Sequence, residues 1–189
     1  MQAIFEPLLH ADETILEVVE GVRWQPLTVL FVLLSGWWMK GFAFVALGAL
    51  GDVRSRRVFP AASTFAAVSV LAGGLLTHLM KGSIDRARPE EASASLDAAV
   101  ATPGSPSFPS GHTSTAFAAA AVVASLHPRL RWPVLALAAC VGLSRIYLGV
   151  HFALDVVAGA ALGLSVGLVA ARLARRWQWK HAAPRQPAS

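Results

Sequence analysis

The sequence has 189 residues, a length that suits one domain rather than two. Hydrophobic residues make up 55% of it and charged residues only 14%, against roughly 25% charged residues in soluble domains. This composition excludes a disordered chain and argues against a water-soluble globule. The net charge of +5 does not indicate nucleic-acid binding, because apolar runs separate the basic residues instead of leaving them together on one solvated face.

Long apolar runs predict an all-α integral membrane bundle, since a helix needs about 20 mainly apolar residues to cross the hydrocarbon core. Six helices are expected, at residues 12–35, 37–52, 58–80, 111–127, 132–148 and 152–174. A turn that contains Lys40 separates the first two. The first half of the 12–35 segment is rich in acidic residues and can instead lie along the membrane interface, so five spans are the alternative.

These helices are expected to form one transmembrane domain over residues 1–176. Its motif-bearing core is 58–174, and a short basic cytoplasmic tail follows at 177–189. The connection 82–109 is far longer than the roughly 12 to 15 residues beyond which structureless loops are usually functional or disordered.

Basic residues outside the motifs predict the orientation. In the six-helix topology most of them share one face, whereas Lys40 and Arg86 fall on the opposite face with the motif cations. The ten on the shared face are Arg54, Arg56, Arg57, Arg129, Arg131, Arg172, Arg175, Arg176, Lys180 and Arg185. An excess of Lys and Arg marks the cytoplasmic side. We therefore expect both termini in the cytoplasm and the 82–109 loop on the outer face of the cell membrane.

Three polar clusters meet at that outer face. They are Lys81 with Arg88–Pro89, the Pro109–His112 stretch, and Ser144–Arg145 with His151 and Asp155. Lys81, Arg88 and Arg145 bring three cations to one site. Because Arg pairs with phosphate through two hydrogen bonds, this set indicates a phosphate ligand.

Ser110 and Gly111 precede an Ala-rich helix whose first amides have no intrahelical partner and lie at the positive end of the helix dipole. A phosphate oxygen can accept those protons. Gly111 leaves room for the ligand, and Ser110 can cap the helix and donate its hydroxyl. Taken alone, the tetrapeptide fits a plain serine cap equally well.

His151 and Asp155 lie four residues apart, one helical turn, and can meet. A carboxylate on one ring nitrogen fixes the tautomer and leaves the other nitrogen free to attack. The alternative is a zinc pair, but no second His or Cys completes the set nearby, and three cations would repel a metal. We expect neither a metal nor another cofactor. Asp85 and Arg86 can pair with each other, and His78 is expected to be a satisfied buried histidine, so none of them is given a role.

The chain resembles the type 2 phosphatidic acid phosphatase superfamily, whose pattern is K-x6-R-P, P-S-G-H and S-R-x5-H-x3-D, with every fixed position present between residues 81 and 155. The resemblance implies metal-independent hydrolysis in two steps. His151 attacks phosphorus to form a phosphohistidine, Asp155 orients it, and His112 protonates the leaving oxygen and later activates water. The implied ligands of the phosphoryl oxygens are Lys81, Arg88, Ser110, the Gly111 amide and Arg145.

The expected function is that of a lipid phosphatase acting on undecaprenyl diphosphate, phosphatidylglycerol phosphate or phosphatidic acid. The rival from another class is a transporter or channel that uses the buried charges as a relay. A vanadium haloperoxidase is a second rival, but the apolar helices argue against it, because that activity in the superfamily belongs to soluble proteins. No feature of the sequence indicates an oligomeric state.

Overall fold

The computed structural model describes residues 2–56, 59–93 and 95–181, and no strand occurs in this part of the chain. Its elements in chain order are α1 (Gln2–Gly21), α2 (Gln25–Leu34), the 3₁₀ helix η1 (Trp37–Lys40), α3 (Phe42–Arg54), α4 (Ala61–Ile84), α5 (Pro89–Ala92), α6 (Gly111–Leu126), the 3₁₀ helix η2 (Pro128–Leu130), α7 (Arg131–Tyr147) and α8 (Ala153–His181). The prediction of an all-α fold is confirmed.

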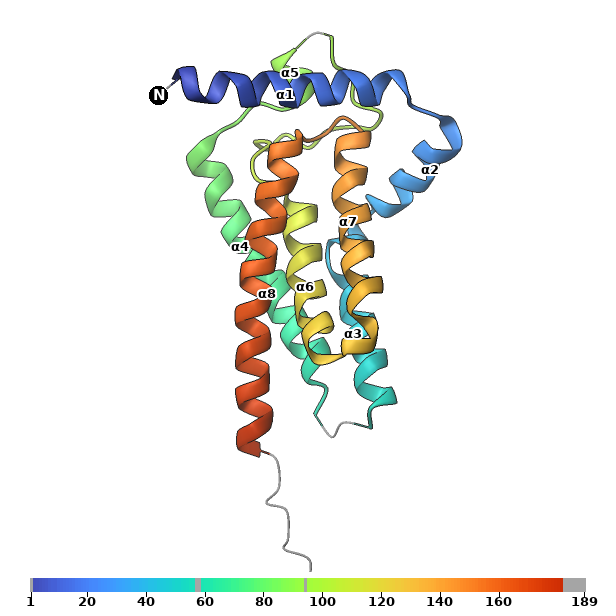
Figure 1. Cartoon of the computed structure of the whole chain (residues 1–189), viewed down its shortest axis with the longest axis vertical. Coiled ribbons are helices and arrows are strands. Elements are labelled where there is room, and N and C mark those ends of the chain that lie inside the picture. Colours follow the sequence, from blue (N-terminus) through green and yellow to red (C-terminus); the bar gives the residue numbers. More distant parts are fainter. Residues whose placement is uncertain (1, 57–58, 94, 182–189) are drawn as a thin grey trace, which may run out of the picture.

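Helix α6 lies at the centre of the bundle, between α4, α7 and α8 (Figure 1). It is rich in alanine, and most of its residues are buried. Small side chains let helix backbones approach closely, which is a common way to pack helices in membranes. The central position of α6 therefore follows from its composition.

Glycines 159, 163 and 167 of α8 recur every fourth residue and pack against α6. A Cβ atom at Gly159 would lie 2.6 Å from the Ser110 carbonyl oxygen, and one at Gly167 would lie 2.7 Å from the Ala121 side chain. Because both distances are shorter than side chains allow, only glycine permits this approach. The contact fixes the start of α6 against the start of α8.

The prediction of one helix at residues 12–35 is wrong. The helix is interrupted at residues 22–24, where the backbone of Trp24 is extended, and Pro26 lies in the first turn of α2. Proline has no amide hydrogen to continue a preceding helix but suits the first turn of a new one. Helix α1 consequently lies across one end of the bundle (Figure 1), as the interfacial alternative anticipated.

Helices α2 and α3 follow one another along the bundle instead of forming a hairpin around residues 35–41 (Figure 1). The Trp24 amide, just before α2, donates to the Tyr147 hydroxyl at the α1 end. Near the end of α3, Gly51 lies against His127 at the opposite end. In place of the two expected spans, α1 lies across the end of the bundle, and α2, η1 and α3 together run once along it. This arrangement favours the five-span alternative.

This arrangement corrects the expectation that both termini lie at the face opposite the motifs. Because α1 does not run along the bundle, the amino-terminal end of the described chain lies beside the motifs, whereas α8 ends at the other end of the bundle (Figure 1). Helix α8 also continues to His181, so residues 177–181 of the expected tail are helical.

Three segments of the described chain are long and apolar enough to cross a membrane, Ala61–Ala92, Pro128–Tyr147 and Ala153–Trp179. Large apolar side chains on their outer faces are exposed, including Leu71 and Leu75 of α4 and Val157 of α8. Surfaces of this kind are typical of lipid-facing helices. The chain is a membrane protein, as predicted.

The basic residues used for the orientation gather at the end of the bundle away from α1. Arg54 closes α3, Arg129 belongs to η2, Arg131 begins α7, and Arg172 and Arg175 lie in the last part of α8. Arg57 and Arg185 lie outside the described residues. The predicted clustering of these cations at one end is present.

Candidate active site

The three predicted clusters converge beneath α1 on a cavity of about 280 Å³. Lys81 comes from the last turn of α4, His112 from the first turn of α6, and Arg145 from the last turn of α7. Arg88 directly precedes α5, and His151 lies in the α7–α8 connection. All five line the cavity, so helices that alternate in direction bring distant motifs to one place.

His151 and Asp155 are in contact, as predicted, but they do not share a helix, because α8 begins at Ala153. The His151 Nδ1 atom lies 3.4 Å from Asp155 Oδ2, and both side chains are buried. Gly149 makes the preceding turn possible, since its φ of 71° is in the left-handed region that glycine favours.

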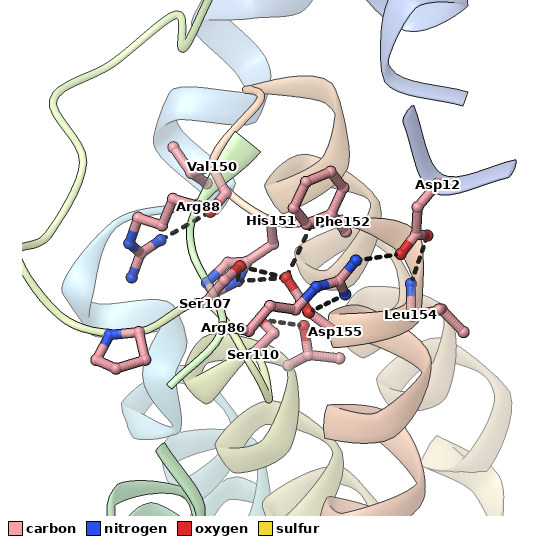
Figure 2. A network of polar contacts seen from close by, with 12 residues as sticks. Asp12, Arg86, Arg88, Ser107, Ser110, Val150, His151, Phe152, Leu154 and Asp155 are labelled. Carbon is pink, nitrogen blue, oxygen red and sulfur yellow. Dashed lines mark hydrogen bonds and ion pairs between the residues drawn. The ribbon is translucent and has the colours of Figure 1, made fainter. Parts of the chain in front are cut away.

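The Asp155 carboxylate accepts further hydrogen bonds (Figure 2). The Phe152 amide donates to Oδ2 at 3.0 Å, the Ser107 hydroxyl donates to the same oxygen, and Arg86 Nη1 donates to Oδ1 at 2.6 Å. Ser107 also lies 3.3 Å from the His151 Nδ1 atom. A buried carboxylate with this many donors is well satisfied as an anion.

Burial lowers the pKa of His151 to about 4, although the hydrogen bond that His151 donates to Asp155 acts in the opposite direction. The imidazole is therefore neutral near pH 7. With Nδ1 facing the carboxylate, the neutral ring keeps its lone pair on Nε2.

Two of the three predicted phosphate-binding cations bond to backbone carbonyl groups around the cavity. Arg88 donates from Nη1 to Val150 at 2.7 Å and from Nε to Ser105 at 2.9 Å. Lys81 donates to the Pro106 and Ser107 carbonyls. These bonds tie the 82–109 connection to the cavity wall and hold both cations in place.

Arg145 and Thr77 keep polar atoms without a partner. Arg145 donates from Nη1 to the Ser35 hydroxyl, but its buried Nε has no hydrogen-bond partner among the described residues, and neither has the buried Thr77 hydroxyl. Both residues line the cavity. Because buried polar groups are rarely left unpaired, these atoms fit a ligand oxygen bound in the cavity.

Ser110 and Gly111 begin α6 as predicted, but Ser110 does not cap it. Its side chain makes no capping hydrogen bond, and its oxygen accepts one from the Thr113 hydroxyl at 2.9 Å. The Ser110 amide donates to the Asp155 carbonyl oxygen at 3.0 Å. Gly111 lines the cavity and has space above it, since a Cβ atom there would meet only Thr77 at 3.6 Å.

Three residues near the site, Arg86, Lys40 and His78, were missed or misread from the sequence. Arg86 bonds to Asp155 and Asp12 rather than to Asp85. Lys40 and His78 both line the cavity, and His78 is exposed rather than buried. A charge in an apolar chain was the only available signal for Arg86 and Lys40, because the residues beside them in the fold are far away in the sequence.

The described residues contain no group of three or more His, Cys, Asp or Glu side chains arranged to hold a metal ion. His151 and Asp155 instead bond to each other, to Ser107 and to Arg86. The hydrogen-bond donors that line the cavity are mainly Lys and Arg side chains, and such a set of cations suits an anionic ligand.

Comparison with known proteins gives one family. The profile of the PAP2 superfamily matches residues 62–179. The lipid A 1-phosphatase of Rhizobium johnstonii is 37% identical over 107 residues, which cover 54% of this chain and 44% of that protein. The decaprenylphosphoryl-5-phosphoribose phosphatase of Mycobacterium tuberculosis is 37% identical over 127 residues, 65% of each chain. The chain thus spans less than half the length of the first of these relatives.

A solved structure has a similar fold. The crystal structure of a transmembrane PAP2 type phosphatidylglycerolphosphate phosphatase from Bacillus subtilis aligns with 97% of this chain and 92% of its own, at a TM-score of 0.75 and 26% sequence identity. The likeness therefore extends beyond the motif-bearing core to nearly the whole chain.

Proposed function

This chain belongs to the PAP2 superfamily, and from that premise we propose that it is a membrane lipid phosphatase that hydrolyses a phosphate or diphosphate ester of a lipid. One observation carries the proposal. The neutral, carboxylate-bound His151 opens onto the same cavity as His112 and the cations Lys81, Arg88 and Arg145. A nucleophile, a second proton-transfer group and an anion-binding set are the parts that phosphoryl transfer requires.

The first step forms a phosphoenzyme. The lone pair on His151 Nε2 attacks phosphorus, and a P–N bond forms as the P–O bond to the lipid breaks. His112 donates a proton to the departing lipid oxygen. Asp155 stays ionised and stabilises the positive charge that develops on His151.

The second step releases phosphate. His112, now neutral, removes a proton from a water molecule whose oxygen attacks phosphorus. The P–N bond breaks, inorganic phosphate leaves, and His151 returns to its neutral form. His112 is protonated again and ready for the next substrate.

The cations stabilise charge in both steps. Phosphoryl transfer spreads negative charge over three equatorial oxygens, so fixed donors around them lower the barrier. Lys81, Arg88, Arg145 and the Gly111 amide serve this purpose from the cavity wall, and the unpartnered Arg145 Nε supports this role. We also assign Ser110 to the phosphate-binding residues. In this structure its hydroxyl oxygen accepts from Thr113, and its amide donates to the Asp155 carbonyl.

The substrate is a lipid that carries a phosphate, and undecaprenyl diphosphate, phosphatidylglycerol phosphate and phosphatidic acid are the candidates. The names of the relatives support the lipid class but differ in the lipid. Lys40 adds a fourth cation to the cavity, and it makes no hydrogen bond or ion pair within the described part of the chain. A fourth cation favours a substrate with a second anionic group, such as the diphosphate.

The site is proposed to face the outside of the cell membrane. The support is the group of arginines at the opposite end of the bundle, since an excess of basic residues marks the cytoplasm. In this orientation α1 lies on the outer side and α8 ends in the cytoplasm.

Phosphate release from a panel of purified lipid monophosphates and diphosphates tests the function. The wild-type protein in detergent should release phosphate from at least one of them, and the His151→Ala variant from none. If the wild type releases none, the proposal is wrong. Ion or lipid flux through liposomes that contain the same protein would then support the transporter.

A further inference from the structure

Arg86 lies between two buried carboxylates (Figure 2). Its Nη1 donates to Asp155 Oδ1 at 2.6 Å, and its Nη2 donates to Asp12 Oδ2 at 2.8 Å. The guanidinium also lies 4.1 Å from the centre of the Phe152 ring. Asp155 and Asp12 are almost fully shielded from solvent, at 0% and 2% exposure. One cation thus serves two buried anions, and within the described part of the chain neither anion has an ion pair with another Lys or Arg.

The two oxygens of Asp155 have separate tasks. Oδ1 is bound by Arg86, whereas Oδ2 accepts from Ser107 and the Phe152 amide and faces His151. A carboxylate held on both sides cannot rotate about its last bond. Arg86 therefore sets the plane in which Oδ2 meets the His151 Nδ1 atom.

Asp12 binds Arg86 from the helix that lies across the end of the bundle. It belongs to α1, and its other oxygen, Oδ1, accepts from the Leu154 amide at 3.0 Å in the first turn of α8. The planar fork of Arg86 is thus fixed at both ends, by Asp12 and by Asp155. This network joins α1 to the helix that carries Asp155.

We propose that Arg86 is a positioning residue for the nucleophile, acting on His151 through Asp155, and that Asp12 of α1 fixes Arg86 for this task. The inference rests on the proposed phosphatase function. Arg86 is not among the residues that line the cavity, so it acts without touching the substrate. Helix α1 then contributes to the site through the Asp12 side chain.

Activity measurements on Arg86→Gln, Asp12→Asn and the double variant test the proposal. Arg86→Gln should lower kcat by roughly 100-fold while KM changes less than about threefold, because a displaced nucleophile slows the chemical step more than binding. Asp12→Asn should lower kcat by roughly tenfold. The double variant should be no worse than Arg86→Gln, because the two residues act as one unit. Arg86→Lys should recover part of the loss.

Arg23→Gln is the matched control. Arg23 also ties the α1 end of the bundle to the site loops, by donating to the Asp97 carbonyl at 2.7 Å and the Tyr147 carbonyl at 3.2 Å, but it does not touch Asp155. Its kcat should stay within about threefold of the wild type. Equal losses in Arg23→Gln and Arg86→Gln, or effects of Asp12→Asn and Arg86→Gln that multiply, would show a merely structural role.

A measurement that needs no turnover separates this proposal from the function on which it rests. With ¹⁵N-labelled histidine, the wild-type His151 signal should show a proton on Nδ1, and Arg86→Gln should populate the other tautomer. An unchanged His151 signal would overturn the positioning role even if the enzyme is active. A wild type without phosphatase activity would instead overturn the proposed function, while the tautomer shift still tests the network.

Discussion

Two buried histidine–aspartate pairs lie at opposite ends of this bundle, His151 with Asp155 and His127 with Asp52. In the second pair, His127 Nε2 lies 3.1 Å from Asp52 Oδ1. The same carboxylate accepts from the Ser63 amide at 3.0 Å and the Ala62 amide at 3.3 Å, in the first turn of α4. Asp52 thus satisfies the free amides of a helix start, which is a structural task.

The surroundings of the two pairs differ more than the pairs themselves. His127 borders a cavity of about 520 Å³ whose other walls are mainly leucine, proline and glycine, with Arg54 and Arg129 exposed at its edge. His151 shares its cavity with two further histidines, His78 and His112, and with four cations that come from different parts of the chain. A histidine–aspartate pair therefore does not identify a nucleophile, and the convergence of anion-binding groups around it does.

Replacing the two histidines in turn gives the largest expected difference. His151→Ala should abolish turnover and any trapped phosphoenzyme, because the nucleophile is gone. His127→Ala should keep kcat within about threefold and lower the melting temperature, since it removes one partner of a buried pair. Phosphate release and thermal unfolding of both variants measure this. Strong loss of chemistry in His127→Ala would show that the ends of the bundle are not independent.

His112→Ala tests the second histidine at the site end. We expect a loss of about 10² to 10⁴ in kcat on lipid substrates, the usual value for a general acid. Substrates with good leaving groups should lose less, because their oxygen departs without a proton. The test is kcat for a series of phosphate esters of graded leaving-group pKa. Equal losses across the series would contradict the acid role.

Arginines at the two ends form the next contrast. Arg145→Met should lower kcat/KM by about 10² to 10³, as expected when a donor to the transition state is lost. Arg129→Met, at the opposite end, should change it less than about threefold. Steady-state kinetics on one lipid phosphate compares them. Similar losses in both variants would show that net charge, not local contact, determines the effect.

The pH dependence sharpens the comparison further. With a pKa of about 4, His151 stays neutral and active above that pH, and kcat/KM should fall tenfold per unit as pH drops below it. An ordinary histidine would start this fall near 6.5. The acid role requires a protonated His112 once the substrate is bound, where the negative charge of the phosphate stabilises the imidazolium. A second fall, in kcat, is therefore expected on the basic side, and the two apparent values belong to the coupled pair. An acidic limb centred near 6.5 would contradict a buried, neutral nucleophile.

Removal of divalent metals should have the smallest effect. If Lys81, Arg88 and Arg145 hold the phosphate, turnover should stay within about twofold in excess EDTA. Vanadate should inhibit, because it can adopt the five-coordinate geometry of the transition state. Loss of activity in EDTA that a divalent ion restores would return His151 and Asp155 to the role of metal ligands.

The local patterns of the sequence were sufficient for the motif helices and for the convergence of their ends. Apolar runs place both ends of α4, α6 and α7 and the start of α8 to within a few residues, because burial in lipid requires long uninterrupted helices. Their alternation then brings Lys81, His112, Arg145 and His151 to one end. Predictions failed in the first part of the chain, where Pro26 breaks a run that otherwise reads as one span.

The membrane class, the helix positions and the motif residues can therefore be predicted from the sequence, since each depends on composition or on neighbours within one or two helical turns. The path of α1 across the bundle, the entry of Lys40 into the cavity and the bond of Arg86 to both Asp12 and Asp155 depend on tertiary structure. Asp12 and Asp155 are separated by most of the chain, and periodicity carries no information about such pairs. The packing of α1 over the end of α7 and the start of α8 decides which of these buried charges meet, because each must find a partner within hydrogen-bond distance.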